Sequence, residues 1–416
     1  MAFHRSDASP SLLTRRSLLG AAAATVLLPH AAFGQSAFET WVANFRRRAL
    51  ARGVSEQTYA RVMNGLKPDN TVFAEFRSQP EFTESLWQYV YRRVSDFRLI
   101  TGREKLRAHA ALLDRIDRDY GVDRHIMVAL WGMESSFGDV IDNPKYMRAV
   151  IPALAALAFG EPRRRSYWEQ ELVNALVIVE RGWGEPNTMI GSWAGAMGHT
   201  QWMPEVWLNI GVDYDNDRRI SPFGPPDDAL AGSARYFVQR GGYRRGEAWG
   251  YEVRLPDGFN TARADNQTMR SVEAWRGMGI ARADGKPFER PSEQMKLWLP
   301  VAGGPAFLLG QNFLAVRSYN PSTSYALATV HLADRIRGDG TFIQPFPGSE
   351  PRTPTLAEVQ EMQRRLTALG HDTDGSDGRV GRDTMRAILA YQRKVGMQPA
   401  DGYAGLKLLA RLRQGG

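Results

Sequence analysis

Apolar residues recur at every third or fourth position over much of the chain. This spacing places them on one face of a helix, so these stretches are predicted to be α-helices packed around a core. The pattern runs through residues 38–53, 104–121, 124–138, 165–182, 226–242 and 312–338. Residues 249–259 and 293–304 alternate apolar and polar positions instead, as short strands do. The sequence therefore predicts a mainly α fold with a small β excursion, an α+β class.

A segment rich in proline and glycine, residues 338–355, separates this body from the tail of the chain. Such a composition indicates a linker. The tail then shows three shorter helical patterns, at residues 356–370, 382–396 and 403–412. We therefore expect a body over residues 35–338, a linker over 339–354 and a three-helix unit over 355–416.

The N-terminal segment has the features of an export signal. Arg15 and Arg16 precede an apolar run from Leu18 to Leu28, and small residues follow before Gln35. A bilayer-spanning helix needs roughly 20 residues, so this run is too short to be an anchor. We predict a twin-arginine-like signal peptide over residues 1–34, with a buried N-terminal helix as the alternative. No later run is long enough for a membrane helix, so we expect a soluble periplasmic protein without stable membrane insertion.

Composition and charge narrow the classes of partner and chemistry. Hydrophobic residues make up 43% of the chain and charged residues 24%, which is ample material for a core. The net charge of +8 favours anionic partners, but lysine and arginine form no long tract, so nucleic acid is not expected. The chain has no cysteine, which excludes disulfides, a lipid-anchoring lipobox and thiolate catalysis. It also lacks an HExxH zinc motif, a GxSxG elbow and a P-loop.

The segment WGMESSFG, residues 131–138, places a glutamate near the end of an apolar helical pattern. Glu134 shares a helical face with Met127, Leu130 and Trp131, and that face should point inward. Burial disfavours the charged form of a carboxyl and raises its pKa, as a general acid near neutral pH requires. Glu134 is therefore a candidate catalytic acid. The alternative is a glutamate that caps a neighbouring turn or pairs with an arginine.

Two further stretches offer groups that could bind a sugar. Residues 191–204, GSWAGAMGHTQWMP, combine small residues with the amide of Gln201, although tight helix packing also needs small residues. Residues 318–327, SYNPSTSYAL, are also an ordinary turn followed by a helix N-cap. Their candidate hydrogen-bonding side chains are Tyr319, Asn320 and Tyr325.

Alternating aspartates in residues 211–228 suggest a calcium loop. The first three ligands of such a loop would be Asp213, Asp215 and Asp217. The backbone carbonyl of Arg219 and the carboxylate of Asp227 or Asp228 could complete the shell. Arg218 stands where an EF-hand loop has glycine, and the last acid comes late, so the regular loop is not met. A structural Ca²⁺ site and a solvated acidic turn both remain open.

In their order along the chain, ALWGMESSFG, GSWAGAMGHTQWMP and YNPSTSYAL resemble the motifs of the lytic murein transglycosylase B family. The resemblance covers roughly residues 37–338. In the tail, VQEMQRRLTALG and DGSDGRVGRDTMRAILAYQ resemble the three-helix peptidoglycan-binding domain type 1. One departure follows QWMP, where the family usually has serines and this chain has Glu205-Val206-Trp207.

The resemblance implies a lysozyme-like catalytic domain that cleaves the β-1,4 bond between N-acetylmuramic acid and N-acetylglucosamine without water. The product has a 1,6-anhydromuramyl end. Glu134 falls on the position of the single catalytic glutamate, which acts first as acid on the glycosidic oxygen and then as base on the muramyl O6 hydroxyl. The acetamido carbonyl of the substrate takes the part that a second carboxylate plays in a retaining glycosidase. No cofactor is required.

The resemblance also implies binding roles by position. Ser192 and Gln201 should lie beside the catalytic site, and Tyr325 should orient Glu134. Other implied contacts to the glycan or its peptide stem come from Tyr319, Asn320, Arg163 and Arg164. The expected partners are peptidoglycan glycan strands, with other cell-wall enzymes as further candidates. The tail should attach the protein to the cell wall. The alternative is that the tail is a three-helix bundle without a ligand. Alternatives for the whole chain are a lysozyme-like hydrolase and a non-catalytic wall-binding protein.

Overall fold

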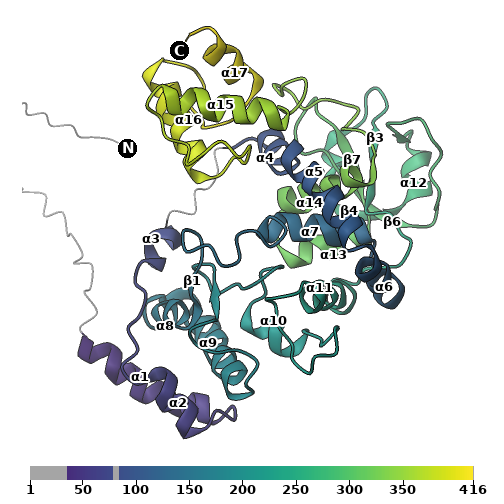
Figure 1. Ribbon diagram of the computed structural model, residues 1–416. Helices are drawn as coiled ribbons and strands as arrows, with labels where there is room; N and C mark the ends of the chain where they lie inside the picture. The colour runs from purple at the N-terminus through teal and green to yellow at the C-terminus, as the bar shows by residue number, and fades with distance from the viewer. Residues whose placement is uncertain (1–34, 78–83, 416) are drawn as a thin grey trace, which may run out of the picture.

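The structure is a computed structural model that describes residues 35–77 and 84–415, so the predicted signal peptide lies outside the described residues. Helices dominate it, with one small sheet, as the sequence predicts. Four separate hydrophobic clusters give the chain four lobes. In Figure 1 these lobes follow an arc from α1 and α2 through the central helices and the sheet to α15, α16 and α17. Arg382 of α16 pairs with Glu75 of α3 at 3.5 Å, so the last lobe meets the first.

The N-terminal lobe is built around α8, whose sequence VIPALAALAFG is apolar on every side. A helix with this pattern must be covered all round, and its neighbours supply that cover. The helices of this lobe are α1 (Gln35–Leu50), α2 (Glu56–Met63), α3 (Val72–Arg77), α8 (Val150–Gly160), α9 (Arg165–Glu180) and α10 (Pro204–Asn209). The one-turn helix η1 (Pro162–Arg164) precedes α9, and β1 (Arg148–Ala149) pairs antiparallel with β2 (Ile190–Gly191).

The central lobe packs around α7, whose residues from Ile126 to Gly132 are all buried. Its helices are α4 (Leu86–Arg93), α5 (Asp96–Ala108), α6 (Ala110–Tyr120), α7 (Arg124–Ser135), α11 (Asp227–Gln239), α13 (Gln311–Tyr319) and α14 (Thr323–Arg337). Figure 1 shows α14 running beside α7 at the centre of the molecule.

Two of the long predicted helices are each broken in two. The pattern at 104–121 is interrupted at His109, which separates α5 from α6. The pattern at 312–338 breaks after Tyr319 because Pro321 restricts the residue before it and supplies no N–H for the helix. Ser322 then caps α14 by accepting a hydrogen bond from the N–H of Tyr325. The break places Tyr319 at one helix end and Tyr325 in the first turn of the next.

The third lobe is a five-stranded antiparallel sheet in the order β4-β6-β7-β3-β5. The predicted strands at 249–259 and 293–304 are confirmed as β3 (Gly250–Arg254) and β6 (Gln294–Trp298). The elements that the alternation did not reveal are β4 (Asp265–Ser271), β5 (Ala281–Arg282), β7 (Ala306–Leu309), η2 (Thr261–Arg263) and α12 (Val272–Gly277). The central strand β7 is buried along its whole length, so it shows no alternation. Strand β4 is largely exposed and polar, so it shows none either.

The C-terminal lobe consists of α15 (Leu356–Ala368), α16 (Arg382–Lys394) and α17 (Leu406–Arg413), which share a core of their own. The proline- and glycine-rich segment before it contains no helix or strand, but it is held in place. Glu252 accepts hydrogen bonds from the backbone N–H groups of Ile343 and Gln344, at 2.8 and 2.7 Å. Glu350 likewise accepts from the N–H groups that begin α17. This segment therefore ties the C-terminal lobe to the sheet.

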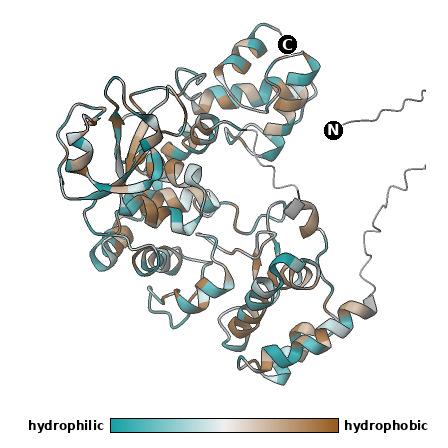
Figure 2. Cartoon of the chain, turned by 180° about the vertical axis from the view of Figure 1, so that it is seen from behind, coloured by the Kyte–Doolittle hydropathy of each residue, from teal (hydrophilic) through white to brown (hydrophobic). Residues whose placement is uncertain are grey.

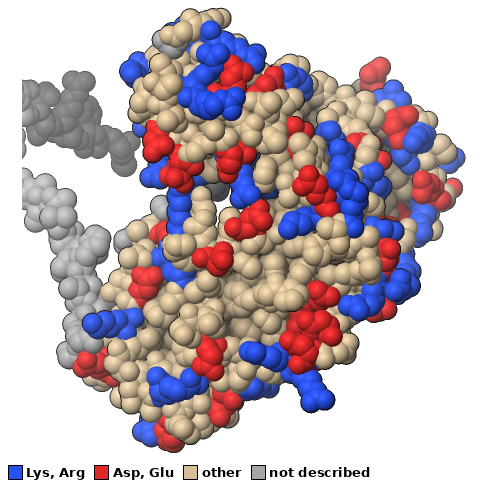
Figure 3. Space-filling view, in the orientation of Figure 1, with Lys and Arg blue, Asp and Glu red and all other residues tan. Residues whose placement is uncertain are grey.

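Most helices in Figure 2 carry both hydrophobic and hydrophilic residues, and the hydrophobic ones supply the buried cores of the lobes. None of the helices in the described ranges is long and apolar enough to cross a membrane. Lysines and arginines on the face drawn in Figure 3 are mixed with acidic residues, without one continuous basic field.

Candidate active site

Glu134 lies in the last turn of α7, and the residues after it explain why the helix stops there. Ser136, Phe137 and Gly138 all adopt left-handed backbone conformations, with φ of 51°, 65° and 90°. The ring of Phe137 folds back and is buried against Gly132, where a Cβ atom would come within 2.5 Å of the ring. Gly132 thus makes room for the ring that ends the helix. The sequence WGMESSFG thus forms the C-terminal end of the buried helix α7, and Glu134 lies at that end.

The carboxyl of Glu134 is held by Tyr325. The hydroxyl of Tyr325 donates a hydrogen bond to Oε1 of Glu134. Burial raises the pKa of Glu134 to about 7, against the opposing effects of this hydrogen bond and of the nearby charge on Arg93. The helix pattern predicts this increase in the pKa of Glu134. A carboxyl that titrates near neutral pH can both give and take a proton there.

Ser135 and His199 clamp the end of α7 to the segment 191–204. The Ser135 hydroxyl donates to the carbonyl oxygen of His199 at 2.6 Å and accepts from the N–H of Gly138 at 2.9 Å. The indole N–H of Trp131 lies 3.1 Å from Nδ1 of His199, and Nε2 of His199 lies 2.8 Å from the carbonyl oxygen of Gly224. An indole N–H can only donate, so Nδ1 accepts and Nε2 carries the proton. Burial lowers the pKa of His199, which favours this neutral form.

The segment 191–204 is a tight loop in which Gly191 and Gly198 allow two stretches of backbone to approach closely, while Gly195 packs against Leu154 of α8. A Cβ atom at Gly191 would lie 2.3 Å from the carbonyl oxygen of Ala196, and one at Gly198 would lie 2.1 Å from that of Pro222. Ser192 accepts a hydrogen bond from the N–H of Ala196 at 3.2 Å. Gln201 adopts a left-handed φ of 55°. Its amide donates to the Gly198 carbonyl at 3.0 Å.

Tyr319 joins this loop to the helices that carry Tyr325. Its hydroxyl donates to the carbonyl oxygen of Thr200 at 2.6 Å, and its ring packs edge-on against Tyr236 with centroids 5.0 Å apart. Burial and the neighbouring Glu134 raise the pKa of the Tyr319 hydroxyl. Asn320 lies next along the chain, and its side-chain oxygen accepts from the N–H of Ser322 at 3.1 Å. The structure therefore gathers Glu134 and Tyr325 with Tyr319 and the loop 191–204.

Arg163 and Arg164 lie apart from this group. Both are exposed in η1, directly before α9. The guanidinium of Arg164 covers the rings of Tyr167 and Trp168, at 4.5 and 5.0 Å from their centroids. The backbone N–H of Arg163 donates to Glu161 at 3.0 Å. The structure records no contact between either arginine and Glu134, so their proposed role needs a substrate long enough to reach α9.

Glu205, where the resemblance led us to expect a serine, is held by other residues. Its carboxylate forms an ion pair with Arg240, with distances of 2.5 and 2.8 Å. Its backbone N–H donates to Glu171 at 3.0 Å. Burial raises the pKa of Glu171 to about 7. These contacts fix the start of α10, directly after the loop that carries Gln201.

Two residues that matter to the site were not predicted from the sequence. Arg93 ends α4 and lies near enough to lower the pKa of Glu134, but nothing in its local sequence distinguishes it from other arginines. His199 lies within residues 191–204, the candidate sugar-binding stretch. A histidine among its small residues was a signal in the sequence that could have marked it as a functional residue. Its partners lie on α7 and near Pro222, which only the fold brings together.

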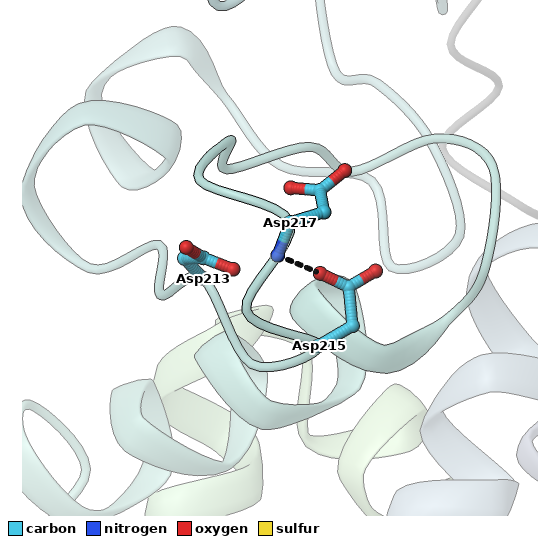
Figure 4. A group of neighbouring side chains, drawn as sticks. All are labelled: Asp213, Asp215 and Asp217. Carbon is cyan, nitrogen blue, oxygen red and sulfur yellow. Dashed lines mark hydrogen bonds between the residues drawn. The ribbon is translucent and has the colours of Figure 1, made fainter.

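The aspartates of the 211–228 loop converge, as Figure 4 shows for Asp213, Asp215 and Asp217. One carboxylate oxygen of each lies within 4.8 Å of the others. Oδ1 of Asp213 is buried without a hydrogen-bond partner, as a ligand atom awaiting a cation would be. Arg218 adopts the left-handed φ of 72° that the glycine of an EF-hand loop supplies. This donor set therefore fits Ca²⁺ in spite of the arginine.

The remaining predicted ligands brace the same loop. Both oxygens of Asp228 accept backbone N–H groups, from Tyr214 at 2.6 Å and Ser221 at 2.9 Å. Burial, together with the charges of Asp215 and Asp213, raises the pKa of Asp228 to about 6 against the effect of these two hydrogen bonds. The backbone N–H of Arg219 donates to Asp217 at 2.7 Å.

Comparison with known families divides the chain at the proline- and glycine-rich segment. Residues 37–334 match the family described as Transglycosylase SLT domain. Residues 355–412 match a peptidoglycan binding domain. The chain is 31% identical over 229 residues to the membrane-bound lytic murein transglycosylase B of Escherichia coli (strain K12). This alignment covers 54% of the chain, which spans 60% of the length of that curated relative.

Two solved structures are similar over most of the chain. SltB3 from Pseudomonas aeruginosa, in complex with NAG-anhNAM-pentapeptide, has 41% sequence identity and a TM-score of 0.71, covering 90% of this chain and 99% of that one. The Escherichia coli lytic transglycosylase Slt35, in complex with calcium, has 25% identity and a TM-score of 0.60. That match covers 71% of this chain and 92% of the other.

Proposed function

Since the chain belongs to the lytic transglycosylase family that carries the transglycosylase SLT domain, we propose that it cleaves the glycan strands of peptidoglycan without water and leaves 1,6-anhydro-MurNAc ends. This membership confirms the resemblance that the three sequence motifs indicated. The curated relative is a lytic murein transglycosylase, and a similar structure holds a fragment with an anhydro sugar and a pentapeptide. The proposal carries that substrate class, a glycan with peptide stems, over to this chain.

The observation that carries the proposal is the environment of Glu134. One carboxyl, with a pKa raised to about 7 by burial, is oriented by a tyrosine hydroxyl. The groups that oppose its rise are Tyr325 and Arg93, and a second carboxylate is not among the causes of the shift. A retaining glycosidase needs a nucleophilic carboxylate about 5 Å from its acid. The site of this chain suits a reaction that uses one carboxyl twice.

In the proposed reaction, Glu134 first donates its proton to the oxygen of the glycosidic bond, and that bond breaks. Tyr325 holds Oε1, so Oε2 is left to face the leaving oxygen. The carboxylate that results is stabilised by the Tyr325 hydroxyl and by Arg93. It then takes the proton of the muramyl O6 hydroxyl as O6 closes on C1. Glu134 is protonated again, and no water enters.

We propose binding roles for Ser192, Gln201, Tyr319 and Asn320, which lie on the elements gathered around Glu134. Arg163 and Arg164 would contact a more distant part of the strand. The C-terminal domain would raise the local concentration of wall polymer at the site. A periplasmic location and a signal peptide over residues 1–34 agree with this substrate and are part of the proposal. Other cell-wall enzymes are candidate partners.

The test is mass spectrometry of the muropeptides that the protein releases from purified peptidoglycan. Products one water lighter than the hydrolysed form establish transglycosylase activity. Reducing-end products would instead establish a lysozyme-like hydrolase, since the same acid serves both reactions. Protein that binds the wall but releases nothing would be a wall-binding protein. The Glu134→Gln variant separates binding from turnover, because glutamine keeps the shape but has no proton to donate.

We also propose that the loop with Asp213, Asp215 and Asp217 binds Ca²⁺ as a structural ion, with the carbonyl of Arg219 and Asp228 as further ligands. The convergent donors and the partnerless Oδ1 of Asp213 support this. Calorimetry with added Ca²⁺ and with chelator tests it. The expected result is a Tm that rises with Ca²⁺ in the wild-type protein and not in Asp213→Asn. An equal Tm in both conditions would leave a solvated acidic turn.

A further inference from the structure

A pocket of about 430 Å³ lies between the central lobe and the C-terminal domain. Its walls come from the end of α4, the start of α5, the residues after α7 and the loop before α16. Figure 1 shows α4 directly beside α15 and α16 at this junction. Met133 and Ser136, which flank Glu134 and Ser135 along the chain, line the pocket. Arg93, which also lines the pocket, lies near enough to Glu134 to lower its pKa, so the pocket is close to the proposed catalytic carboxyl.

Most of the charged groups in this pocket are already paired. Arg379 forms an ion pair with Asp139 at 2.5 Å, and Lys145 forms one with Asp374 at 2.6 Å and another with Asp383. Each of these pairs joins one domain to the other. They fix the walls of the pocket and leave little of their own charge for a ligand.

Two guanidinium groups in the pocket have no such partner. Within the part of the chain that the structure describes, Arg93 and Arg98 lie within 4.0 Å of no carboxylate. Arg98 donates to the backbone carbonyls of Gly132 and Arg92, at 3.2 and 3.3 Å. Arg93 lies over the ring of Tyr89, 4.2 Å from its centroid. Neither contact neutralises the charge.

The surroundings of Arg93 and Arg98 disfavour the charged forms of both side chains. Burial and the neighbouring charges of Arg93, Arg92 and Arg379 together lower the pKa of Arg98 to about 9. Burial and Arg92 also lower the pKa of Arg93. Tyr89 and Glu84 oppose this effect on Arg93, but neither arginine is paired with a carboxylate among the described residues. Buried cations without an ion-pair partner cost free energy, and a bound anion would recover part of it. The pocket thus has the charge, the size and the position of a site for an anionic group of the substrate.

We propose that Arg93 and Arg98 bind a carboxylate of the peptide stem on the glycan strand that Glu134 cleaves. This rests on the proposed function, in which the substrate carries peptide stems. The stem leaves the strand at the muramic acid, the sugar on which Glu134 acts, and the pocket lies close to Glu134. Guanidinium groups match a carboxylate through two parallel N–H donors, which lysine cannot supply in that geometry. The stem would then be enclosed between the catalytic and peptidoglycan-binding domains, and the C-terminal domain would take part in choosing the substrate.

The first experiment measures kcat/KM on matched glycan strands that carry stems and on strands from which an amidase has removed them. Wild-type protein should prefer strands with stems by at least tenfold. Arg93→Gln should reduce that ratio close to one, and Arg93→Lys should recover it only in part. Arg276→Gln, at an exposed position on α12, is the matched control and should keep the wild-type ratio.

The second experiment uses wild-type protein alone, so it does not depend on the folding of a variant. Calorimetric titration compares N-acetylmuramyl pentapeptide with the same molecule after its carboxyls are amidated. Amidation should weaken binding at least tenfold. Equal affinities, together with an unchanged ratio in Arg93→Gln, would overturn the stem site. A wild-type protein that forms no anhydro products from either strand would instead overturn the proposed function, so the two failures are distinct.

Discussion

The hydroxyl of Tyr325 donates a hydrogen bond to the carboxyl of Glu134, although the two residues are 191 positions apart in the chain. Tyr325 lies in the first turn of α14 and Glu134 in the last turn of α7. The contact therefore depends on the packing of these two helices. It opposes the effect of burial on the pKa of Glu134, so it sets the pH at which the carboxyl gives up its proton.

The pH dependence of kcat/KM should follow the protonated form of Glu134. With a pKa of about 7, the acid is lost as the pH rises through 7, so the alkaline limb should lie there. Tyr325→Phe removes a donor that stabilises the carboxylate, so the pKa rises and the alkaline limb moves to higher pH. The rate should also fall roughly tenfold as orientation is lost. A stopped assay of muropeptide release at several pH values measures both effects.

Tyr391→Phe is the control for this change. Tyr391 is buried in the C-terminal domain, and its hydroxyl has no hydrogen-bond partner among the described residues. Its loss should leave the pH profile where it was. An alkaline limb that stays at the same pH in Tyr325→Phe would show that this hydroxyl does not control Glu134.

Glu134→Gln should make the protein more stable while it abolishes turnover. Folding raises the pKa of Glu134 from about 4.5 to about 7, so its stabilising contribution is complete below pH 4.5 and is lost as the pH rises through 7. Glutamine stays neutral throughout. At 1.36 kcal/mol per pKa unit, the advantage of the variant should grow by about 2.5 kcal/mol between pH 5 and pH 8. Denaturant unfolding at the two pH values measures it, and an advantage that does not change with pH would contradict the buried carboxyl.

Ser135→Ala should lower kcat with little change in KM. It removes the hydroxyl that joins the carbonyl of His199 to the N–H of Gly138 and so loosens the turn that holds Glu134. Two buried polar groups lose a partner, at about 1–3 kcal/mol each. Steady-state kinetics and thermal unfolding test this against Ser292→Ala, an exposed serine that should change neither. A normal kcat in a destabilised Ser135→Ala protein would limit Ser135 to stability.

Gly132→Ala should be destabilising, although alanine is the better helix former. The added Cβ atom would meet the ring of Phe137 at 2.5 Å, and that ring ends the helix beneath Glu134. We expect a loss of about 1–3 kcal/mol in the free energy of unfolding, with a lower kcat. Gly277→Ala is the matched control, because Gly277 is also helical and nothing lies within 4 Å of its added Cβ atom. It should be neutral or stabilising, and equal effects of the two substitutions would contradict the packing argument.

The sequence by itself determined the elements whose signal is local. The three- and four-residue spacing of apolar residues predicts α7, α9 and α11, and the alternation at 249–259 and 293–304 predicts two strands of the sheet. The motif around Glu134 determines both the helix and its C-terminal end, because Phe137 and Gly138, which end the helix, lie within a few residues of the glutamate. A strand that is buried on both faces, such as β7, shows no alternation of apolar and polar residues, so its position could not be predicted from the sequence.

The tertiary structure decided which side chains surround the end of α7 that carries Glu134. Tyr325, Arg93 and His199 come from distant segments, and no local rule relates their positions to one another. The same is true of the pocket that holds Arg93 and Arg98, because it exists only where the C-terminal domain meets α4 and α5. Local propensities act over a few residues, whereas burial and charge–charge interactions depend on distances in space. The sequence therefore pointed to Glu134 as the candidate acid, whereas its pKa and its hydrogen-bond partner depend on the fold.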